Sequence, residues 1–233
     1  MTNAVILPLE AEMELVITAD NSGTIGEKAA DNVEAPNQVV GKFACRVALM
    51  ECLAAYAEPR TIVMQNFTDD SAWHEYKAGV GDVLAEAGFI NLPVTGSTES
   101  NFSSMQSALG LTIVGTRKKR AVYEWTGNES FAVIGKPFVG QEVLDNMQRI
   151  PSVLLLKEFT ETTGVKAIAP VGSKGIAETF YKWTGRKVKL ECDLNLDITA
   201  GPATCFIIAF DSEKSTEVIK LGGENFHILQ TSD

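Results

Sequence analysis

Two acidic residues, Asp20 and Glu51, have the chemistry and the spacing of a metal-binding pair. Asp20 directly follows an apolar run, residues 15–19, and precedes a glycine-containing turn sequence, residues 21–24. Glu51 falls in a segment with helical periodicity. Carboxylates on two different elements can hold Mg²⁺, because this hard cation takes oxygen ligands and itself bridges phosphate oxygens. The pair therefore predicts a magnesium-nucleotide site.

The elements that must position this pair follow from apolar periodicity. Residues 15–19 predict a buried strand, and the Asn-Ser-Gly sequence after them should end it and leave Asp20 at its carboxyl edge. Apolar residues recur at helical spacing from 39 to 57, and Glu58-Pro59 should end that helix. A strand at 61–64, a helix at 72–87 and a strand at 109–114 are expected to follow.

Three segments resemble the aminoimidazole-ribotide synthetase-like (AIR synthase, PurM-like) superfamily. The first matches the Asp-Gly-Val-Gly-Thr-Lys strand end of that superfamily at Asp20, Gly23 and Thr24. The second matches its Gly-Ala-Glu-Pro segment at Ala57, Glu58 and Pro59. Glu51 then stands where the superfamily has a metal-binding aspartate. The third segment, residues 95–102 with the strand at 109–115, is similar to the Gly-Gly-Glu-Thr segment.

The resemblance implies an α+β or α/β fold with two PurM-like domains. Residues 1–120 would form the amino-terminal ATP- and metal-binding domain, and residues 121–233 the carboxyl-terminal α/β domain. The implied cofactors are ATP and Mg²⁺, with Asp20 and Glu51 as metal ligands. The implied nucleotide-binding residues are Asp20, Gly23, Thr24, Gly96, Ser97 and Thr98. A homodimer formed through the amino-terminal domain is also implied.

The chain departs from the superfamily pattern at two motif positions. Ile25 replaces the motif lysine, so any role of that lysine would pass to Lys28. Ser97 replaces the acid of the third segment, and Glu99 is displaced by two residues. Within the superfamily, the sequence is most similar to a group of α-ribazole kinases, which phosphorylate a nucleoside in cobalamin lower-ligand salvage.

The second half of the chain reads as a separate domain that begins near residue 120. A strand at 131–137, a helix at 140–147, a strand or helix at 153–156 and a helix at 176–183 are expected, with strands over 189–196 and 203–210. Gly172-Ser173-Lys174-Gly175 precedes a helix, where backbone N–H groups and Lys174 could bind an anion. The same four residues could equally form an ordinary turn.

Composition excludes several classes of protein. The 233 residues carry a net charge of −10 and a pI near 4.8, which argues against a nucleic-acid or anionic-membrane surface. No apolar run reaches the ~18 residues needed to span a bilayer, so a cytoplasmic location is expected. Four cysteines and two histidines show no zinc-binding spacing. No Gly-Lys-Ser/Thr phosphate loop is present, because Pro137 follows Gly135-Lys136.

These observations leave three functional hypotheses. The first is a Mg-ATP-dependent phosphotransferase that converts α-ribazole, or a similar small nucleoside, to its 5′-phosphate. In it, Asp20 and Glu51 would hold the metal, and Lys28 or Lys174 would neutralise developing charge as catalytic residues. The second is an AIR-synthase-like ATP-dependent ligase or cyclase. The third is a noncatalytic nucleotide-binding protein, motivated by Ile25 and Ser97.

Overall fold

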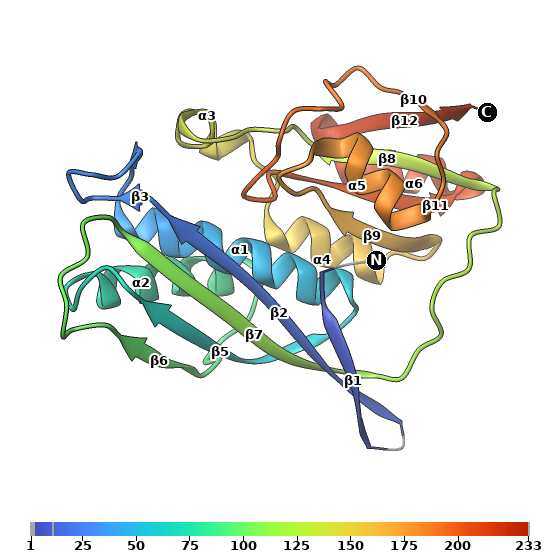
Figure 1. Cartoon of the computed structure of the whole chain (residues 1–233). Coiled ribbons are helices and arrows are strands. Elements are labelled where there is room, and N and C mark those ends of the chain that lie inside the picture. Colours follow the sequence, from blue (N-terminus) through green and yellow to red (C-terminus); the bar gives the residue numbers. More distant parts are fainter. Residues whose placement is uncertain (1–2, 11, 233) are drawn as a thin grey trace. The chain divides into compact units, whose positions relative to one another are not determined.

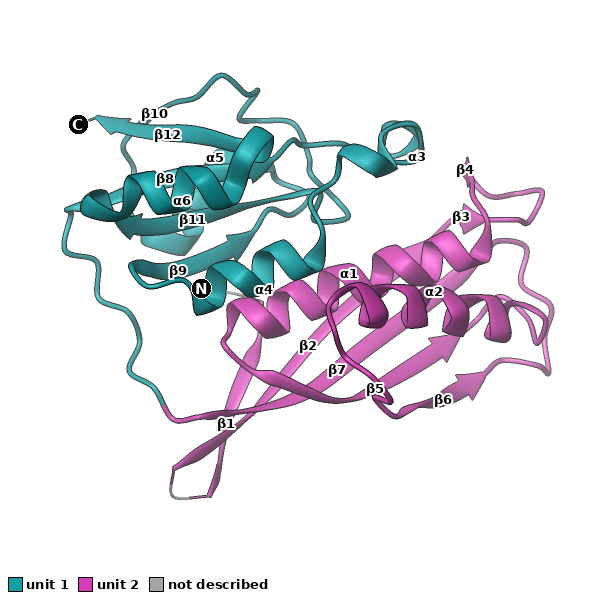
Figure 2. Cartoon of the chain, turned by 180° about the vertical axis from the view of Figure 1, so that it is seen from behind, with its two compact units in different colours: residues 1–2, 120–233 teal, residues 3–119 magenta. Residues whose placement is uncertain are grey.

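The computed structural model describes residues 3–10 and 12–232, and its contacts divide them into two compact units. The amino-terminal unit comprises residues 3–119, and the carboxyl-terminal unit starts at Arg120 (Figure 2). Each unit has its own five-stranded sheet and its own core. The two units are therefore described separately.

The amino-terminal unit is built on a mixed sheet of strand order β1-β2-β7-β5-β6 (Figure 1). The pairs β1/β2, β2/β7 and β7/β5 are antiparallel, whereas β5/β6 is parallel. The strands are β1 (Val5–Glu10), β2 (Met13–Gly23), β5 (Glu58–Asn66), β6 (Val94–Thr98) and β7 (Ala108–Lys118). A two-stranded parallel pair, β3 (Ile25–Gly26) with β4 (Val33–Glu34), joins β2 to the first helix.

Helices α1 (Asn37–Ala54) and α2 (Ala72–Glu86) lie side by side on the sheet (Figures 1 and 2). Alternation along the strands buries Val16, Ile62 and Ile113, and α1 contacts the three strands that carry them. The two helices approach so closely that a Cβ at Gly79 would lie 1.9 Å from the Gln38 carbonyl oxygen. Gly41 likewise leaves no room for a side chain against the backbone of Tyr76. Glycine is therefore required where α1 and α2 cross.

Two expected boundaries in this unit are wrong. β2 continues through Asn21, Ser22 and Gly23, so Asp20 lies three residues inside the strand and not at its edge. The turn-forming sequence stays extended because every one of its residues pairs with β7, and tertiary pairing overrides local propensity. Helix α1 ends at Ala54, and Tyr56 adopts a left-handed φ of 58°. Glu58 and Pro59 begin β5 instead, with Pro59 at a bulge that needs no ladder hydrogen bond.

The third segment that resembles the superfamily, residues 95–102, is partly a strand. Residues 94–98 form β6, an edge strand parallel to β5, and only the residues after Thr98 form a loop. The hydrophobic signal for this strand is weak because β6 is mostly exposed. The expected helix at 72–87 and the strands at 15–19, 61–64 and 109–114 are confirmed, each within a longer element or to within one residue.

The carboxyl-terminal unit has an antiparallel sheet of order β10-β12-β8-β11-β9. Its strands are β8 (Glu129–Gly135), β9 (Val165–Pro170), β10 (Lys189–Glu191), β11 (Cys205–Asp211) and β12 (Phe226–Ser232). Its helices are α3 (Gln141–Asp145), α4 (Val153–Glu161), α5 (Gly175–Thr184) and α6 (Ser215–Gly222). The alternating run expected as a strand over 189–196 keeps only the three residues of β10. Beyond them Leu194 and Leu196 pack onto the core from irregular chain.

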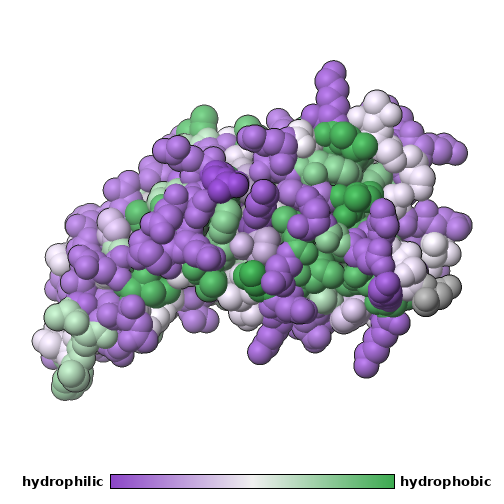
Figure 3. Space-filling view, turned by 90° about the horizontal axis from the view of Figure 1, so that it is seen from above, coloured by the Kyte–Doolittle hydropathy of each residue, from purple (hydrophilic) through white to green (hydrophobic). Residues whose placement is uncertain are grey.

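Aromatic residues dominate the core of this unit. Phe131, Phe180 and Trp183 form edge-to-face contacts on the α5 side of the sheet, whereas Phe159 of α4 contacts Phe206 on the opposite strand face. Polar residues cover much of the molecular face drawn in Figure 3, with apolar groups between them. Over residues 3–10 and 12–232, no helix combines the length and the apolar character needed to cross a membrane.

Candidate functional site

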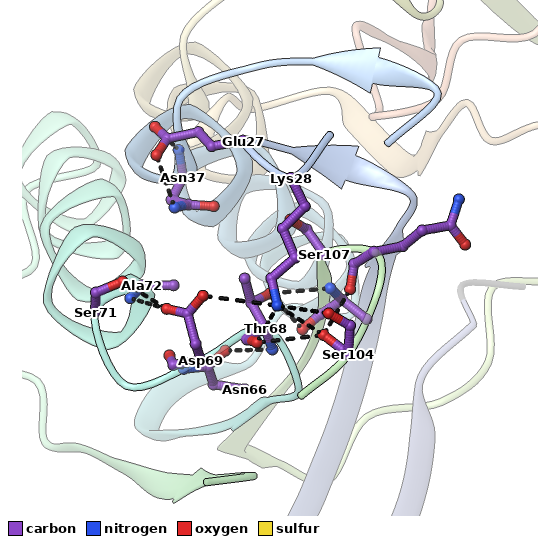
Figure 4. A network of polar contacts seen from close by, with 12 residues as sticks. Glu27, Lys28, Asn37, Asn66, Thr68, Asp69, Ser71, Ala72, Ser104 and Ser107 are labelled. Carbon is purple, nitrogen blue, oxygen red and sulfur yellow. Dashed lines mark hydrogen bonds and ion pairs between the residues drawn. The ribbon is translucent and has the colours of Figure 1, made fainter. Parts of the chain in front are cut away.

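One end of the amino-terminal sheet collects the ends of four strands. Gly23 closes β2 opposite Ala108, the first residue of β7, and Asn66 closes β5 opposite Thr98, the last residue of β6. The loops that leave these strands carry hydroxyl, carboxyl and amide groups that hydrogen-bond to one another (Figure 4). This sheet end therefore assembles polar groups from segments far apart in sequence.

Lys28 lies at the centre of this polar network. Its ammonium donates to the Thr68 carbonyl at 2.7 Å, to the Ser104 carbonyl at 2.9 Å and to Ser104 Oγ at 3.0 Å (Figure 4). Asp69 Oδ2 lies 3.7 Å away. A lysine ammonium has three N–H donors, and three oxygen atoms already take them. Lys28 therefore ties the loop after β5 to the loop before β7 and presents no unengaged charge.

Replacement of Lys28 by methionine is expected to lower the free energy of unfolding by about 2 kcal/mol, because two backbone carbonyls lose a charged donor. Urea unfolding followed by tryptophan fluorescence measures the change. Lys174→Met is the matched control, since Lys174 is exposed. Equal stabilities of Lys28→Met and the native chain would contradict the tying role of Lys28.

Asp31 holds a second connection across the same sheet end. Its carboxylate accepts hydrogen bonds from Ser107 N and Ser107 Oγ, both at 2.7 Å, and from Lys28 N at 2.9 Å. Burial opposes its ionisation, but the hydrogen bonds from Ser107 and Lys28 outweigh that effect and lower the pKa of Asp31. Gly26 lies against this contact, and a Cβ there would come within 2.3 Å of Ser107 Oγ.

Asp69 and Asn66 organise the turn between β5 and α2. Asp69 Oδ1 accepts from the Ala72 backbone N–H at 3.1 Å and from the Ser71 hydroxyl, so it caps the first turn of α2. The hydrogen bond from Ser71 is the main cause that lowers the pKa of Asp69. Asn66 Nδ2 donates to the Asp69 carbonyl and to Thr98 Oγ1. Thr98 is thereby connected through Asn66 and Thr68 to Lys28.

The start of α1 is flanked by two carboxylates. Glu27 accepts from the Asn37 backbone N–H at 3.2 Å and from Asn37 Nδ2 at 3.3 Å, and Glu75 of α2 accepts from the same Nδ2 at 2.8 Å. Asn37 is buried, and its Oδ1 has no hydrogen-bond partner among the described residues. The amide therefore joins the loop after β3 to both helices.

Asp20 lies on the strand face of β2 that points toward α1. Thr18, on the same face, donates from Oγ1 to the Ala48 carbonyl at 2.8 Å. Burial raises the pKa of Asp20 to about 6, and only the Asn21 backbone N–H counteracts it. A cation bound to such a partly buried carboxylate would offset the cost of burying its negative charge. Asp20 thus fits the role of a metal ligand.

Glu51 lies on the other side of the contact between Thr18 and Ala48. Helix α1 runs back along β2, so Asp20 and Glu51 extend from that contact in opposite directions (Figure 1). Their backbone positions are separated by roughly 10 Å along the two elements, from the rise per residue of strand and helix. Asn3 donates to the buried Glu51 carboxylate from its backbone N–H at 3.1 Å and from Nδ2 at 3.3 Å. An ion shared by both carboxylates would have to lie between them, beside Thr18.

The remaining expected nucleotide-binding residues take different places. Gly23 ends β2 with open space where a Cβ would be, which leaves its backbone approachable. Thr24 adopts a left-handed φ of 62°, a conformation that costs a non-glycine residue about 1–3 kcal/mol. The hydrogen bond from the Thr24 N–H to the Ser107 carbonyl stabilises this conformation. Gly96 is required for packing, because a Cβ would lie 1.9 Å from the Met64 carbonyl oxygen. Ser97 is exposed on β6.

Lys174 belongs to the carboxyl-terminal unit, before α5. The turn at 172–175 is closed by its own hydrogen bond, from Gly175 N to the Gly172 carbonyl at 3.2 Å. In the first turn of α5, Ala177 N already donates to the Leu196 carbonyl. These contacts favour an ordinary turn over an open anion site.

The donor set limits how a metal ion could be held. No cluster of three or more histidine, cysteine, aspartate or glutamate ligands occurs among residues 3–10 and 12–232. Mg²⁺ commonly binds through one or two carboxylates and completes its shell with water and substrate phosphates. Asp20 could supply one carboxylate oxygen to such a site and the nucleotide the phosphate oxygens, whereas Glu51 accepts two hydrogen bonds from Asn3 and lies roughly 10 Å farther along the elements.

Sequence reasoning missed several members of the polar network. Thr68, Ser104 and Ser107 lie in loops, where isolated hydroxyl residues carry no periodic signal. The available signal was position, since Asn66 and Thr68 come two and four residues after the strand predicted at 61–64, and Ser107 comes two residues before the strand predicted at 109–114. Polar residues at several strand ends could have been expected to meet at one edge of the sheet.

Similar solved structures share this arrangement of elements. AaThiL, complexed with AMPPCP and TMP, has a TM-score of 0.66 and 13% sequence identity, covering 99% of this chain and 84% of its own. E. coli HypE, a hydrogenase maturation protein, has a TM-score of 0.65 and 12% identity, covering 92% of this chain and 79% of its own. T. maritima PurL complexed with FGAR has a TM-score of 0.54 and 13% identity, covering 90% of this chain and 33% of its own.

This chain has a PurM-like fold. No protein-family model and no curated protein sequence matches it. The PurM-like fold agrees with the expected α+β architecture. Identities of 11–13% across the structures compared establish shared architecture only, so the chemistry must be argued from the residues of this chain.

Proposed function

We propose that this protein is a Mg-ATP-dependent phosphotransferase that acts on a small nucleoside, with α-ribazole as the substrate and α-ribazole 5′-phosphate as the product. The observation that carries the proposal is the partly buried carboxylate of Asp20, whose pKa is raised to about 6, within a PurM-like fold. The structure of AaThiL with AMPPCP, a non-hydrolysable ATP analogue, supports nucleotide binding by this fold.

In the proposed reaction, Mg²⁺ bound to the nucleotide would supply charge neutralisation on the phosphates. Asp20 would bind the ion near the sheet end, where the open backbone at Gly23 would let a phosphate approach. Glu51, the second proposed ligand, would have to reach this ion from the other side of Thr18. Lys28 would act indirectly, by keeping the loops at 67–71 and 99–107 together around the site. Thr98 joins the same network through Asn66. Lys174 has no supported part in this scheme.

An AIR-synthase-like ligase or cyclase is the second candidate, since PurL shares the fold. Such an enzyme would release ADP and inorganic phosphate, whereas a kinase would release ADP and a phosphorylated nucleoside. A noncatalytic nucleotide-binding protein is the third candidate, because Ile25 and Ser97 replace motif residues.

The deciding experiment measures ADP release by the native chain with Mg-ATP, with and without α-ribazole, and identifies the products by mass. We expect release that depends on α-ribazole and a product heavier by one phosphoryl group. Free phosphate without a phosphorylated nucleoside would favour the ligase or cyclase. ATP binding without turnover would exclude α-ribazole as the substrate.

We also propose that the chain dimerises through the amino-terminal unit. β1 is an edge strand whose Val5, Leu7 and Leu9 side chains are 45–53% exposed, which is unusual for an unpaired sheet edge in water. Light scattering on the purified chain tests this proposal, and a monomeric mass at micromolar concentration would remove it.

A further inference from the structure

The carboxyl-terminal unit holds a cavity of about 440 Å³ beside β10 and β12. Its volume falls in the range typical of ligand-binding clefts, about 300–1,000 Å³. Its lining consists of residues 191–193, residues 226–228 and Gln230, with no lysine or arginine among them. None of these residues belongs to the nucleotide site proposed for the amino-terminal unit.

The cavity lies at the edge of β12, and not on a face of the sheet. Consecutive residues of a strand point to opposite faces, yet His227 and Ile228 both line the cavity. One edge of β12 pairs with β8 along residues 226–229, and the other edge pairs with β10 only at residues 230–232. Among the described residues, the outer edge of residues 226–229 has no strand partner, because β10 ends at Glu191 (Figure 1).

This free edge lacks the features that keep exposed strand edges from pairing. Natural sheets protect such edges with lysine, proline or a bulge. Residues 226–229 read Phe-His-Ile-Leu, and their pairing with β8 is regular. Every second residue of this roughly 13 Å stretch turns its N–H and C=O groups toward the free edge. A further strand of about four residues could therefore pair here.

The charge around the cavity indicates what kind of strand would fit. The Asp193 carboxylate is 69% exposed, and a hydrogen bond from His227 Nδ1 at 2.8 Å lowers the pKa of Asp193. Glu191 is also exposed and pairs with Lys189, which neutralises part of the negative charge. A second copy of the chain would bring the same carboxylates to an isologous interface, and each copy carries a net charge of −10. A partner segment that carries lysine or arginine is therefore favoured over a second copy.

We propose that the free edge of β12 receives an extended basic segment of a partner protein, which adds to the sheet as a strand beside residues 226–229. Main-chain hydrogen bonds to β12 would supply affinity, and lysine or arginine side chains near Glu191 and Asp193 would supply specificity. Ile228, which is 46% exposed, would contact an apolar side chain of the added strand. This binding is separate from phosphoryl transfer, so its test does not depend on the proposed function.

Fluorescence anisotropy with the labelled peptide Lys-Val-Lys-Val-Lys-Val tests the proposal on the full chain. We expect a fully N-methylated version of this peptide to bind at least about tenfold more weakly, because it has no backbone N–H groups that can pair with β12. Hydrogen exchange followed by NMR should show slower exchange of backbone amides within residues 226–229 when the unmethylated peptide is bound.

A double variant, Glu191→Gln with Asp193→Asn, is expected to weaken peptide binding by about fivefold, because two exposed charge pairs are lost. Glu158→Gln with Glu161→Gln is the matched control. It removes the same charge from exposed positions on α4, which contacts β9 at the opposite edge of the sheet. Equal losses in the two double variants would show that net charge alone attracts the peptide, and would overturn the proposal.

Three further outcomes would overturn the proposal. The unmethylated peptide could fail to bind, or the N-methylated peptide could bind equally well. Slower amide exchange confined to residues outside 226–229 would place the peptide elsewhere on the chain. Slower exchange at residues 226–229 without peptide, increasing with protein concentration, would assign the edge to pairing between two copies.

Discussion

Asp20→Asn is expected to reduce α-ribazole-dependent ADP release by about 100-fold or more, because loss of even an outer-shell partner of a metal ligand costs 10–100-fold. The same variant is expected to be more stable than the native chain at pH 7.5. Burial raises the pKa of Asp20 to about 6 from an ordinary value of 3.8, so the ionised carboxylate is unfavourable in the folded state. A gain of up to about 3 kcal/mol in the free energy of unfolding should result.

The pH dependence of stability shows whether the stabilisation by Asp20→Asn comes from removal of a buried negative charge. Between pH 4 and 6 the unfolded chain has already released the Asp20 proton while the folded chain retains it, so native stability falls as the pH rises. The difference between Asp20→Asn and the native chain should therefore vanish below pH 4 and reach its full size above pH 6. Urea unfolding at pH 4 and pH 7.5 measures it. Asp70→Asn, at an exposed aspartate, serves as the control, and equal stability of Asp20→Asn and the native chain at pH 7.5 would refute the burial argument.

Gly79→Ala is expected to lower the free energy of unfolding by about 3 kcal/mol or more. The added Cβ would lie 1.9 Å from the Gln38 carbonyl oxygen and 2.6 Å from the Lys42 backbone nitrogen, both main-chain atoms that a rotamer change cannot move. Helices α1 and α2 would have to separate, which is the overpacking penalty at its upper end. Equilibrium urea unfolding of the purified variant gives the change directly.

Gly81→Ala provides a control in the same helix. No atom lies within 4 Å of a Cβ at Gly81, so the alanine meets no obstacle there. Alanine is favoured over glycine in a helix by about 0.5–1 kcal/mol, and Gly81→Ala should therefore stabilise the chain. The same glycine-to-alanine substitution should thus lower the free energy of unfolding at position 79 and raise it at position 81. A small loss at Gly79 would show that the two helices can shift apart without much penalty.

Sequence patterns were sufficient for the elements that bury a continuous apolar face. The helix at 72–87 and the strands around residues 17, 62 and 111 are recovered because their periodicity reports burial directly. The resemblance at Asp20, Gly23 and Thr24 located one strand end of the candidate site. The PurM-like fold followed from that resemblance and is supported by the shared architecture of solved structures.

The rest depended on contacts that no local pattern records. β6 is mostly exposed, so only its pairing with β5 defines it as a strand. Residues 21–23 form strand because β7 lies beside them. The hydrogen bonds of the Lys28 ammonium are made to the carbonyls of Thr68 and Ser104, which are 40 and 76 residues away in sequence. A short motif cannot reveal such distant partners. The position of Lys28 near the motif therefore predicted a charge available to a ligand, whereas in the structure Lys28 hydrogen-bonds two loops to each other.

The ammonium of Lys28 also bears on how the protein could be engineered. Its partners, the Thr68 and Ser104 carbonyls, lie on the loop after β5 and the loop before β7. These loops are brought together by the pairing of β5 with β7, which extends to the hydrogen bond from Phe67 N to the Ala108 carbonyl. Local helices form faster than such distant pairings, so this sheet end should be among the last parts of the unit to become ordered. A peptide carrying residues 14–35 alone would contain the motif without its supports. Transplanting this site into another scaffold would require moving the whole four-strand end, and not a short loop.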